Sequence, residues 1–203
     1  MFSLPISTEL HKPIHKKVIF NKFPTEFTGE RKKRFDDDVG KITITNEISP
    51  VSINISEGKE IQAIYVVQVD LKKSEYDERN IIYITKLFGQ HLLVALKYQE
   101  MYRLAIYQTR LLQSEWKSKD DINLNLVGLT LDAVWENLVS KVSGIVVSQK
   151  YTLDQQIQIE EEKVRLKEQI SKLEKRIKTE TQSKKKFDLY QRLKEYQKKL
   201  EEL

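Results

Sequence analysis

Cysteine is absent from this chain of 203 residues, and glycine and proline are scarce, with six and four copies. The lack of cysteine excludes disulfide bonds, thiolate metal sites and cysteine nucleophiles. The glycines occur singly, so the sequence has no glycine-rich loop for phosphate groups. No apolar run approaches the roughly 18 residues that a membrane-spanning helix needs, and the N-terminus lacks the apolar core of a signal peptide. We therefore expect a cytoplasmic protein with no membrane partner.

Histidine is also rare, and its three copies form no clear metal-binding pattern. His11 and His15 stand four residues apart, but Pro13 between them disfavours the regular helix that would bring both onto one face. The acidic run at residues 36–38 points in several directions on a helix, so we interpret it as a solvent-facing helix end. We expect no bound metal ion or cofactor.

The apolar residues make up 39% of the chain and the charged residues 32%, and the apolar ones are concentrated before about residue 150. Residues 1–24 contain three prolines and no sustained periodicity, which predicts an extended N-terminal arm. Residues 25–147 show mixed helix and strand patterns, and residues 153–203 contain neither glycine nor proline. The sequence thus predicts an α+β protein, with one mixed-sheet α/β domain followed by a long, charged helical tail.

Helix and strand signals follow one another in the first half of the domain. A helix is expected to stop at Gly40, and the alternating run at residues 41–48 predicts a half-buried strand. Residues 49–55 are expected to form a turn and a short extended piece. The apolar, β-branched run at residues 61–72 predicts a central strand that is covered on both faces.

The second half of the domain continues the mixed pattern. A helix capped near Ser74 is expected to run through Leu87, and a hairpin over residues 91–112 with its turn near Gln99. The apolar stripe of the helix that begins near Ser74 consists of Ile81, Ile82, Ile84 and Phe88. Trp116 is expected to be buried. Apolar residues at helical spacing between the glycines at 128 and 144 predict the helix that closes the domain.

The helical tail carries two short apolar registers, one at residues 166–177 and one at residues 189–203. Both step by three and four residues, as in a coiled coil. The register breaks between them, because Glu180 and Lys184 occupy positions where a continuous seam needs apolar side chains. The tail is therefore either an antiparallel helical hairpin or one rod with a shifted seam. Its narrow stripe needs cover from the tail itself, from a second copy or from another protein.

One triplet is similar to a catalytic signature. Asp70-Leu71-Lys72 lies at the end of the predicted central strand, where nucleases of the restriction-endonuclease-like class place an acid that binds Mg²⁺ and a lysine that orients water. Such a site needs an upstream acid, which Glu60 or Glu47 would supply. In a chain this rich in charge, the same triplet also arises by chance, and a solvated strand end is the more ordinary interpretation.

Basic residues gather at two places in a chain whose net charge is +5. Lysine and arginine runs can neutralise phosphates and bind nucleic acid without sequence preference, although a solvated helix face is the simpler interpretation. The first run is Arg31, Lys32, Lys33 and Arg34. The second is Lys184, Lys185 and Lys186, with Lys175, Arg176 and Lys178 nearby.

Several short motifs together resemble the prokaryotic domain-of-unknown-function family 4391. They are Leu4-Pro5-x-Ser7-Thr8, Ser49 to Ile55, Glu60-Ile61-Gln62, Ser114-Glu115-Trp116 and Gly128 to Leu138. The resemblance covers nearly the whole chain and rests on the order and spacing of the motifs. It implies a setting in antiviral defence or restriction-modification loci, beside helicases and DNA methyltransferases, and it transfers no functional residues.

Two functions follow as expectations, beside a third possibility, a free-standing nucleic-acid-binding module whose affinity would fall steeply with salt. The first is a non-enzymatic accessory or assembly subunit of a DNA-processing defence system, which binds a larger helicase or DNA methyltransferase, and in which the tail self-associates or touches DNA. The alternative is a Mg²⁺-dependent nuclease that uses Asp70 and Lys72 with Glu60. The two differ in whether the acids meet on neighbouring strands.

Overall fold

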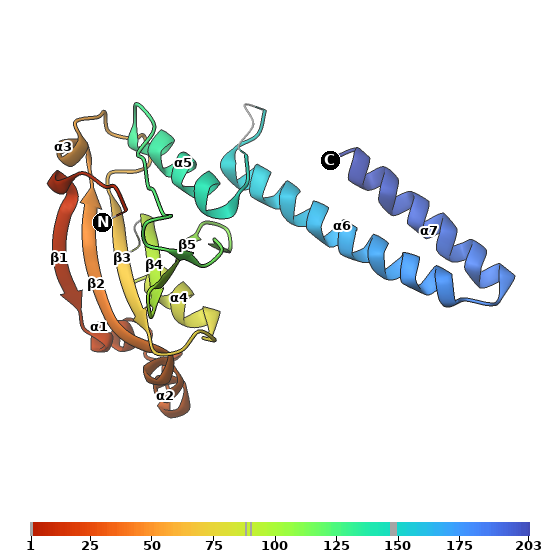
Figure 1. Cartoon of the computed structure of the whole chain (residues 1–203), viewed down its shortest axis with the longest axis horizontal. Coiled ribbons are helices and arrows are strands. Elements are labelled where there is room, and N and C mark those ends of the chain that lie inside the picture. Colours follow the sequence, from red (N-terminus) through yellow and green to blue (C-terminus); the bar gives the residue numbers. More distant parts are fainter. Residues whose placement is uncertain (1, 88, 90, 147–149) are drawn as a thin grey trace. The chain divides into compact units, whose positions relative to one another are not determined.

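The computed structural model describes residues 2–87, 89, 91–146 and 150–203. The chain folds into two compact units, Met1–Val146 and Val147–Leu203. The first contains a mixed sheet with helices, and the second is helical. This arrangement confirms the predicted α+β class (Figure 1).

The first unit is built on one mixed sheet, whose strands lie in the order β1 to β6 (Figure 1). The strands are β1 (Glu9–Ile14), β2 (Val39–Ile48), β3 (Ile64–Leu71), β4 (His91–Tyr98), β5 (Met101–Tyr107) and β6 (Leu111–Gln113), and β7 (Lys117–Ser118) pairs with β5. Neighbours are antiparallel except β3 and β4, which are parallel. A parallel pair needs a crossover, and helix α4 (Glu78–Thr85) supplies it. The predicted central strand is confirmed as β3.

One face of the sheet carries a core that is covered by helices. Alternate residues of β3, namely Val67, Val69 and Leu71, pack there in a cluster of buried side chains. Helices α1 (Lys16–Lys22), α2 (Gly29–Asp38) and α4 contribute Ile19, Phe35, Ile81 and Ile84 to the same cluster. Phe27 and Phe35 of this cluster make an edge-to-face contact, with 5.3 Å between their ring centroids.

Helix α5 (Leu131–Ser143) covers part of the opposite face, and it forms where the sequence predicts it. Thr130 caps its N-terminus by accepting a hydrogen bond from the Ala133 N–H, and Gly144 ends it at a φ of 72°. Trp135 of α5 packs edge-to-face on His91, and α5 also contacts β5 and β6.

Several local predictions are wrong. Gly40 does not end a helix but lies inside β2, because α2 already stops at Asp38. Residues 49–55 contain a short helix, α3 (Pro50–Ile53), since Ser49 and Ser52 form a reciprocal capping box. The cap of α4 is Asp77 rather than Ser74.

The other differences are smaller. The segment expected as an extended arm contains a short 3₁₀ turn, η1 (Ile6–Thr8), followed by β1 and α1. Trp116 is only half-buried, with the Arg103 guanidinium 4.9 Å from its ring centroid. The hairpin of β4 and β5 turns at Gln99, as predicted, with a φ of 52°. Phe88 of the predicted apolar stripe lies outside the described residues.

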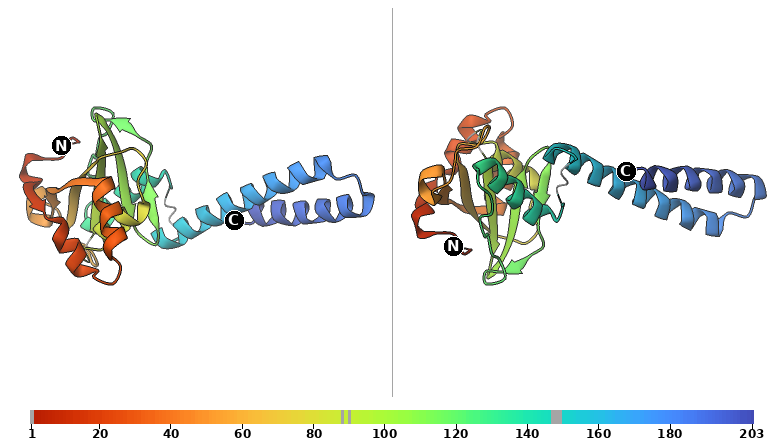
Figure 2. Two further views of the ribbon diagram at one scale, coloured as in Figure 1. Left: turned by 90° about the horizontal axis from the view of Figure 1, so that it is seen from below. Right: turned by 90° about the horizontal axis from the view of Figure 1, so that it is seen from above.

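The second unit is an antiparallel hairpin of α6 (Leu153–Thr179) and α7 (Ser183–Glu201), which lie alongside each other in both views of Figure 2. Its buried cluster consists of Leu173, Ile177, Leu189 and Leu193. The chain reverses at the register break, where the Glu180 carboxylate accepts a hydrogen bond from the Gln182 N–H. The apolar stripe of α6 packs against that of α7, so the tail needs no continuous apolar seam through the turn.

No helix in the described part of the chain is long and apolar enough to cross a membrane.

Candidate functional site

The triplet Asp70-Leu71-Lys72 does not form one catalytic group. Leu71 belongs to the helix-covered core, so Asp70 faces the other side of the sheet, where its carboxylate accepts a hydrogen bond of 2.6 Å from Gln68 Nε2. The Lys72 ammonium instead donates to the backbone oxygen of Asp36 in α2. The lysine is therefore occupied in joining the end of β3 to α2.

The two acids predicted as partners of Asp70 lie near the other end of β3. Glu60 precedes Ile64, the first residue of β3, and Ile64 lies about 20 Å from Asp70 at 3.3 Å per residue. Glu47 pairs opposite Tyr65, near that same far end. The structure thus does not bring Glu60 or Glu47 to Asp70, and no metal-capable cluster of three or more histidine, cysteine or acidic side chains occurs among the described residues.

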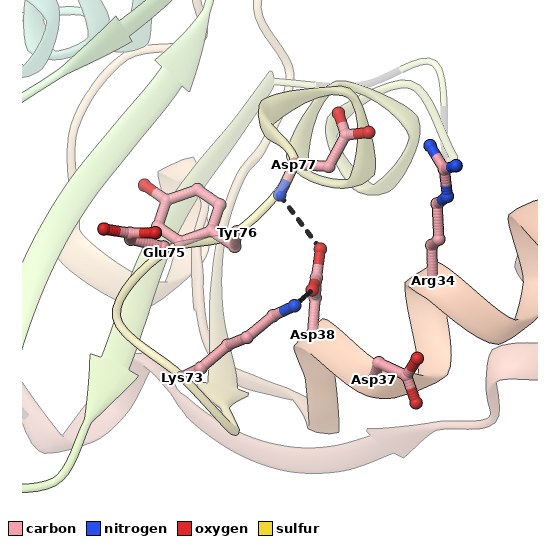
Figure 3. A pocket seen from close by; sticks show the side chains of 7 residues that line it. All are labelled: Arg34, Asp37, Asp38, Lys73, Glu75, Tyr76 and Asp77. Carbon is pink, nitrogen blue, oxygen red and sulfur yellow. Dashed lines mark hydrogen bonds and ion pairs between the residues drawn. The ribbon is translucent and has the colours of Figure 1, made fainter.

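An ionic site does form where β3, α2 and α4 meet (Figure 3). It surrounds an open cavity of about 300 Å³. The side chains that line it are Arg34, Asp37, Asp38, Lys73, Glu75, Tyr76 and Asp77. Four acidic groups face two basic ones, so the cavity is acidic.

Asp38 is the centre of this ionic site, and its burial corrects the prediction of a solvent-facing helix end. Only 3% of the residue is exposed. Its carboxylate accepts hydrogen bonds from the Asp77 N–H at 2.9 Å and from Asn80 Nδ2 at 2.8 Å, and Lys73 Nζ lies 2.7 Å away. The hydrogen bond to Asp38 raises the pKa of Lys73. Because Asp77 and Asn80 begin α4, the acid at the end of α2 stabilises the N-terminus of another helix.

Arg31 completes the ionic site from α2. Its guanidinium lies 2.5 Å from the Asp77 carboxylate and within 6 Å of the ring centroids of Phe27 and Tyr83, and only 13% of the side chain is exposed. Hydrogen bonds from Arg79 and from Arg31 hold the pKa of Asp77 well below its usual range. Arg31 therefore fixes α4 to α2 and is not free to contact phosphate groups.

The rest of the first basic run is partly occupied as well. Lys32 lies 5.6 Å from the ring centroid of Phe20, and Arg34 pairs with Glu30 at 2.6 Å. Lys33 is exposed. The second run differs, because Lys184 and Lys185 are exposed and Lys186 is half-buried at the start of α7. Among the described residues, no carboxylate lies within ion-pair distance of these three lysines.

A second polar arrangement, which the sequence analysis did not predict, lies at the end of the sheet where β3 and β4 begin. The Asp132 carboxylate accepts hydrogen bonds from the backbone N–H groups of Lys59, Glu60 and Ile61. Desolvation by burial raises the pKa of Asp132, but these hydrogen bonds outweigh it, and the pKa is lowered. A Cβ at Gly58 would lie only 2.2 Å from the Asp132 carboxylate, so this close approach requires glycine.

His91 lies beside this loop, and its ring centroid is 4.7 Å from that of Trp135. Burial lowers the pKa of His91, although the charges of Asp132 and Glu60 oppose the change. A mostly neutral ring in contact with a tryptophan is suited to packing. We infer that this arrangement attaches α5 to the sheet. In the sequence, the only indication of it was that Glu60 and Asp132 both lie in motifs of the family resemblance.

Four of the five family motifs have residues at this same end of the sheet, whereas Ser114-Glu115-Trp116 lies beside Arg103 and Leu104 of β5. The Ser7 hydroxyl donates to the backbone oxygen of Ser52, and Ser56 forms a β-bridge with Thr130. The segments around them expose four large apolar side chains, which we call the apolar end patch. It consists of Ile6 (83% exposed), Val51 (94%), Val127 (58%) and Leu129 (87%).

No curated protein and no solved structure matches the chain. The family model described as Domain of unknown function (DUF4391) matches residues 2–200. That match includes every motif used above, the apolar end patch and nearly all of the α6–α7 hairpin. The chain therefore belongs to the DUF4391 family.

Proposed function

We propose that this protein is a non-enzymatic accessory subunit, which docks on a larger DNA-processing protein of a cytoplasmic prokaryotic defence system. The apolar end patch is the observation that carries this proposal. Four large apolar side chains with exposures of 58% to 94% lie on segments that meet at one end of the sheet. Grouped exposed apolar surface marks protein interaction sites far more often than isolated apolar residues do.

Helix caps and hydrogen bonds hold the segments beneath the patch, which lowers the entropy cost of ordering them on docking. Val51 lies on α3. The side chains of Ser49 and Ser52 each accept a hydrogen bond from the other residue's backbone N–H and so cap this helix. Leu129 directly precedes Thr130, the cap of α5. The Asn137 side chain also donates to the backbone oxygen of Val127, at 3.0 Å. The patch therefore presents preformed apolar side chains.

The class of partner follows from the setting that the family resemblance implies, namely a helicase or a DNA methyltransferase. Nuclease chemistry has less support, because Asp70 meets neither of its expected partner acids and Lys72 is bound to α2. An accessory role needs no reaction centre. It needs a docking surface, and the apolar end patch supplies one.

The test begins with a tagged full-length chain, isolated from its native host, and with mass spectrometry of the proteins that come with it. A recovered helicase or methyltransferase is then purified and titrated against the parent chain. Val51→Asp with Leu129→Asp should weaken binding at least tenfold, because both changes put a charge into a desolvated contact. Val18→Asp is the matched control, since Val18 is also exposed, at 47%, but lies on α1.

Two outcomes overturn the proposal. In one, the patch variant binds the partner as tightly as the parent chain does. In the other, the chain alone cleaves DNA with Mg²⁺, and Asp70→Ala abolishes the cleavage. The second outcome would restore the nuclease alternative.

A further inference from the structure

We infer that the end of the hairpin formed by residues 172–194, here called the hairpin tip, binds single-stranded nucleic acid. The inference deepens the proposed function by naming the class of nucleic acid that the accessory subunit contacts. It rests on that function only for its biological setting, because the binding itself belongs to the isolated chain.

Charge is the first observation. The hairpin tip contains nine basic and three acidic residues, a net charge of +6, while the whole chain carries +5. The remainder of the hairpin, residues 153–171 and 195–203, contains five basic and eight acidic residues, a net charge of −3. The positive charge of this unit is thus confined to one end of a rod, which is the arrangement expected for contact with a phosphate backbone.

Availability of these charges is the second observation. Ion pairs in the hairpin occur outside the tip, between Lys163 and Glu160 and between Arg165 and Glu162, and also between Lys198 and Glu202. In the described part of the chain, none of the basic groups of the tip has a carboxylate within ion-pair distance. Phosphates could therefore approach these groups without displacing an internal partner.

Two exposed aromatic side chains are the third observation, and they favour unpaired bases over a duplex. Phe187 is 62% exposed and Tyr190 is 47% exposed. Leu189 and Leu193 between and beyond them are buried against α6, so the two rings lie off the internal seam. Folding has left these rings uncovered, although aromatic residues usually contribute strongly to a core.

The rings and the lysines share one surface of α7. Lys184 precedes Phe187 by three residues, and Lys186 and Lys194 stand four residues before and after Tyr190. Residues at these spacings are neighbours on a helix. Alternating rings and ammonium groups match a single strand, whose bases stack on the rings while its phosphates meet the lysines.

The experiment measures fluorescence anisotropy of a labelled 20-nucleotide single strand of thymidines, and of a duplex of equal length, with the purified full-length chain. The parent should bind the single strand more tightly than the duplex. Lys184→Gln, Lys185→Gln and Lys186→Gln together should weaken that binding at least about tenfold and lower the salt slope by about 2. Circular dichroism confirms that each variant keeps its helical content.

Two matched controls test whether binding depends on the basic and aromatic residues of the tip, and not on such residues anywhere in the chain. Lys163→Gln, Arg165→Gln and Lys167→Gln remove the same charge from the rest of the hairpin and should change the affinity less than threefold. Phe187→Ala with Tyr190→Ala should weaken binding about fivefold or more. Tyr151→Ala, a residue that is 43% exposed outside the tip, should leave binding unchanged.

The inference is overturned if the two triple variants lose affinity equally, or if the parent does not bind the single strand. Equal affinity for duplex and single strand, with no effect of the aromatic variant, overturns the choice of single strands. Competition by polyglutamate as effective as that by the oligonucleotide would indicate an acidic protein instead. The variant Val51→Asp with Leu129→Asp should bind the oligonucleotide normally, so failure here is distinguishable from failure of the proposed function.

Discussion

The two basic runs of this protein look alike in sequence and serve different purposes in the structure. In the first, Arg31 is buried beside Asp77 and two aromatic rings, and Arg34 is paired with Glu30. In the second, Lys184 and Lys185 are exposed, on a helix whose internal face is already filled by leucines. The first run stabilises the sheet unit, whereas the second leaves its charge available to a partner. A basic run therefore indicates binding only when neighbouring acids do not neutralise it.

The largest effect is expected from a change that breaks the ionic site of the first unit, here also called the sheet unit. Asp38→Ala should lower the free energy of unfolding by about 3 kcal/mol, because it leaves the Asp77 N–H and the Asn80 amide without their buried acceptor. Urea unfolding followed by circular dichroism measures the loss. Asp37→Ala is the control, since Asp37 is exposed one residue earlier on the same helix. Equal losses in the two variants would show that Asp38 has no special role.

A smaller effect separates the two basic runs directly. Arg31→Gln should cost about 1 to 2 kcal/mol of stability, because the amide cannot maintain the ion pair with Asp77 or the contact with Tyr83. It should leave oligonucleotide affinity nearly unchanged. Thermal melting and the anisotropy assay together give both values. A large loss of affinity without loss of stability would place Arg31 in the nucleic-acid surface and contradict the comparison.

Much of the fold could be predicted because its signals are periodic. The apolar run that forms β3 and the helical stripe that forms α5 gave the centre and one cover of the sheet. Short elements were missed where a side chain decides the backbone. The capping box of Ser49 and Ser52 converts an expected extended piece into α3, and Gly40 enters a strand where its missing side chain lets the Asp70 backbone approach.

The candidate site was harder to predict, since it depends on contacts between distant segments. Asp38 and Asp77 are far apart in sequence, and nothing local in the acidic run indicates that one of its members caps another helix. Asp70 and Lys72 stand two residues apart, a spacing that puts both side chains on one face of a regular strand. Lys72 lies beyond the end of β3, however, and its ammonium donates to the backbone of α2, whereas Asp70 bonds to Gln68. The hairpin was among the predicted alternatives, and the register break marked its turn.

Acid should weaken the sheet unit through Asp77. The pKa of Asp77 is lowered in the folded protein from its ordinary value of 3.8. The stability that its charge contributes is therefore present above about pH 4 and is lost as the pH falls towards the folded pKa. Asp77→Asn should therefore be less stable than the parent near neutral pH, and the gap should narrow in acid. Urea unfolding at pH 6, 4 and 3 tests this. A gap that is constant with pH would mean that the charge of Asp77 is not what stabilises α4.

The smallest expected effect concerns the hairpin tip. Changing Lys184, Lys185 and Lys186 to glutamine should shift the melting temperature by no more than about 2 °C. Among the described residues these lysines have no carboxylate within ion-pair distance, and none of them belongs to the buried leucine cluster. The measurement is thermal melting at low and at physiological salt, with the triple variant at Lys163, Arg165 and Lys167 as the control, which breaks two ion pairs. A clear fall in melting temperature for the tip variant alone would show that its lysines stabilise the hairpin, and the difference between the two basic runs would then disappear.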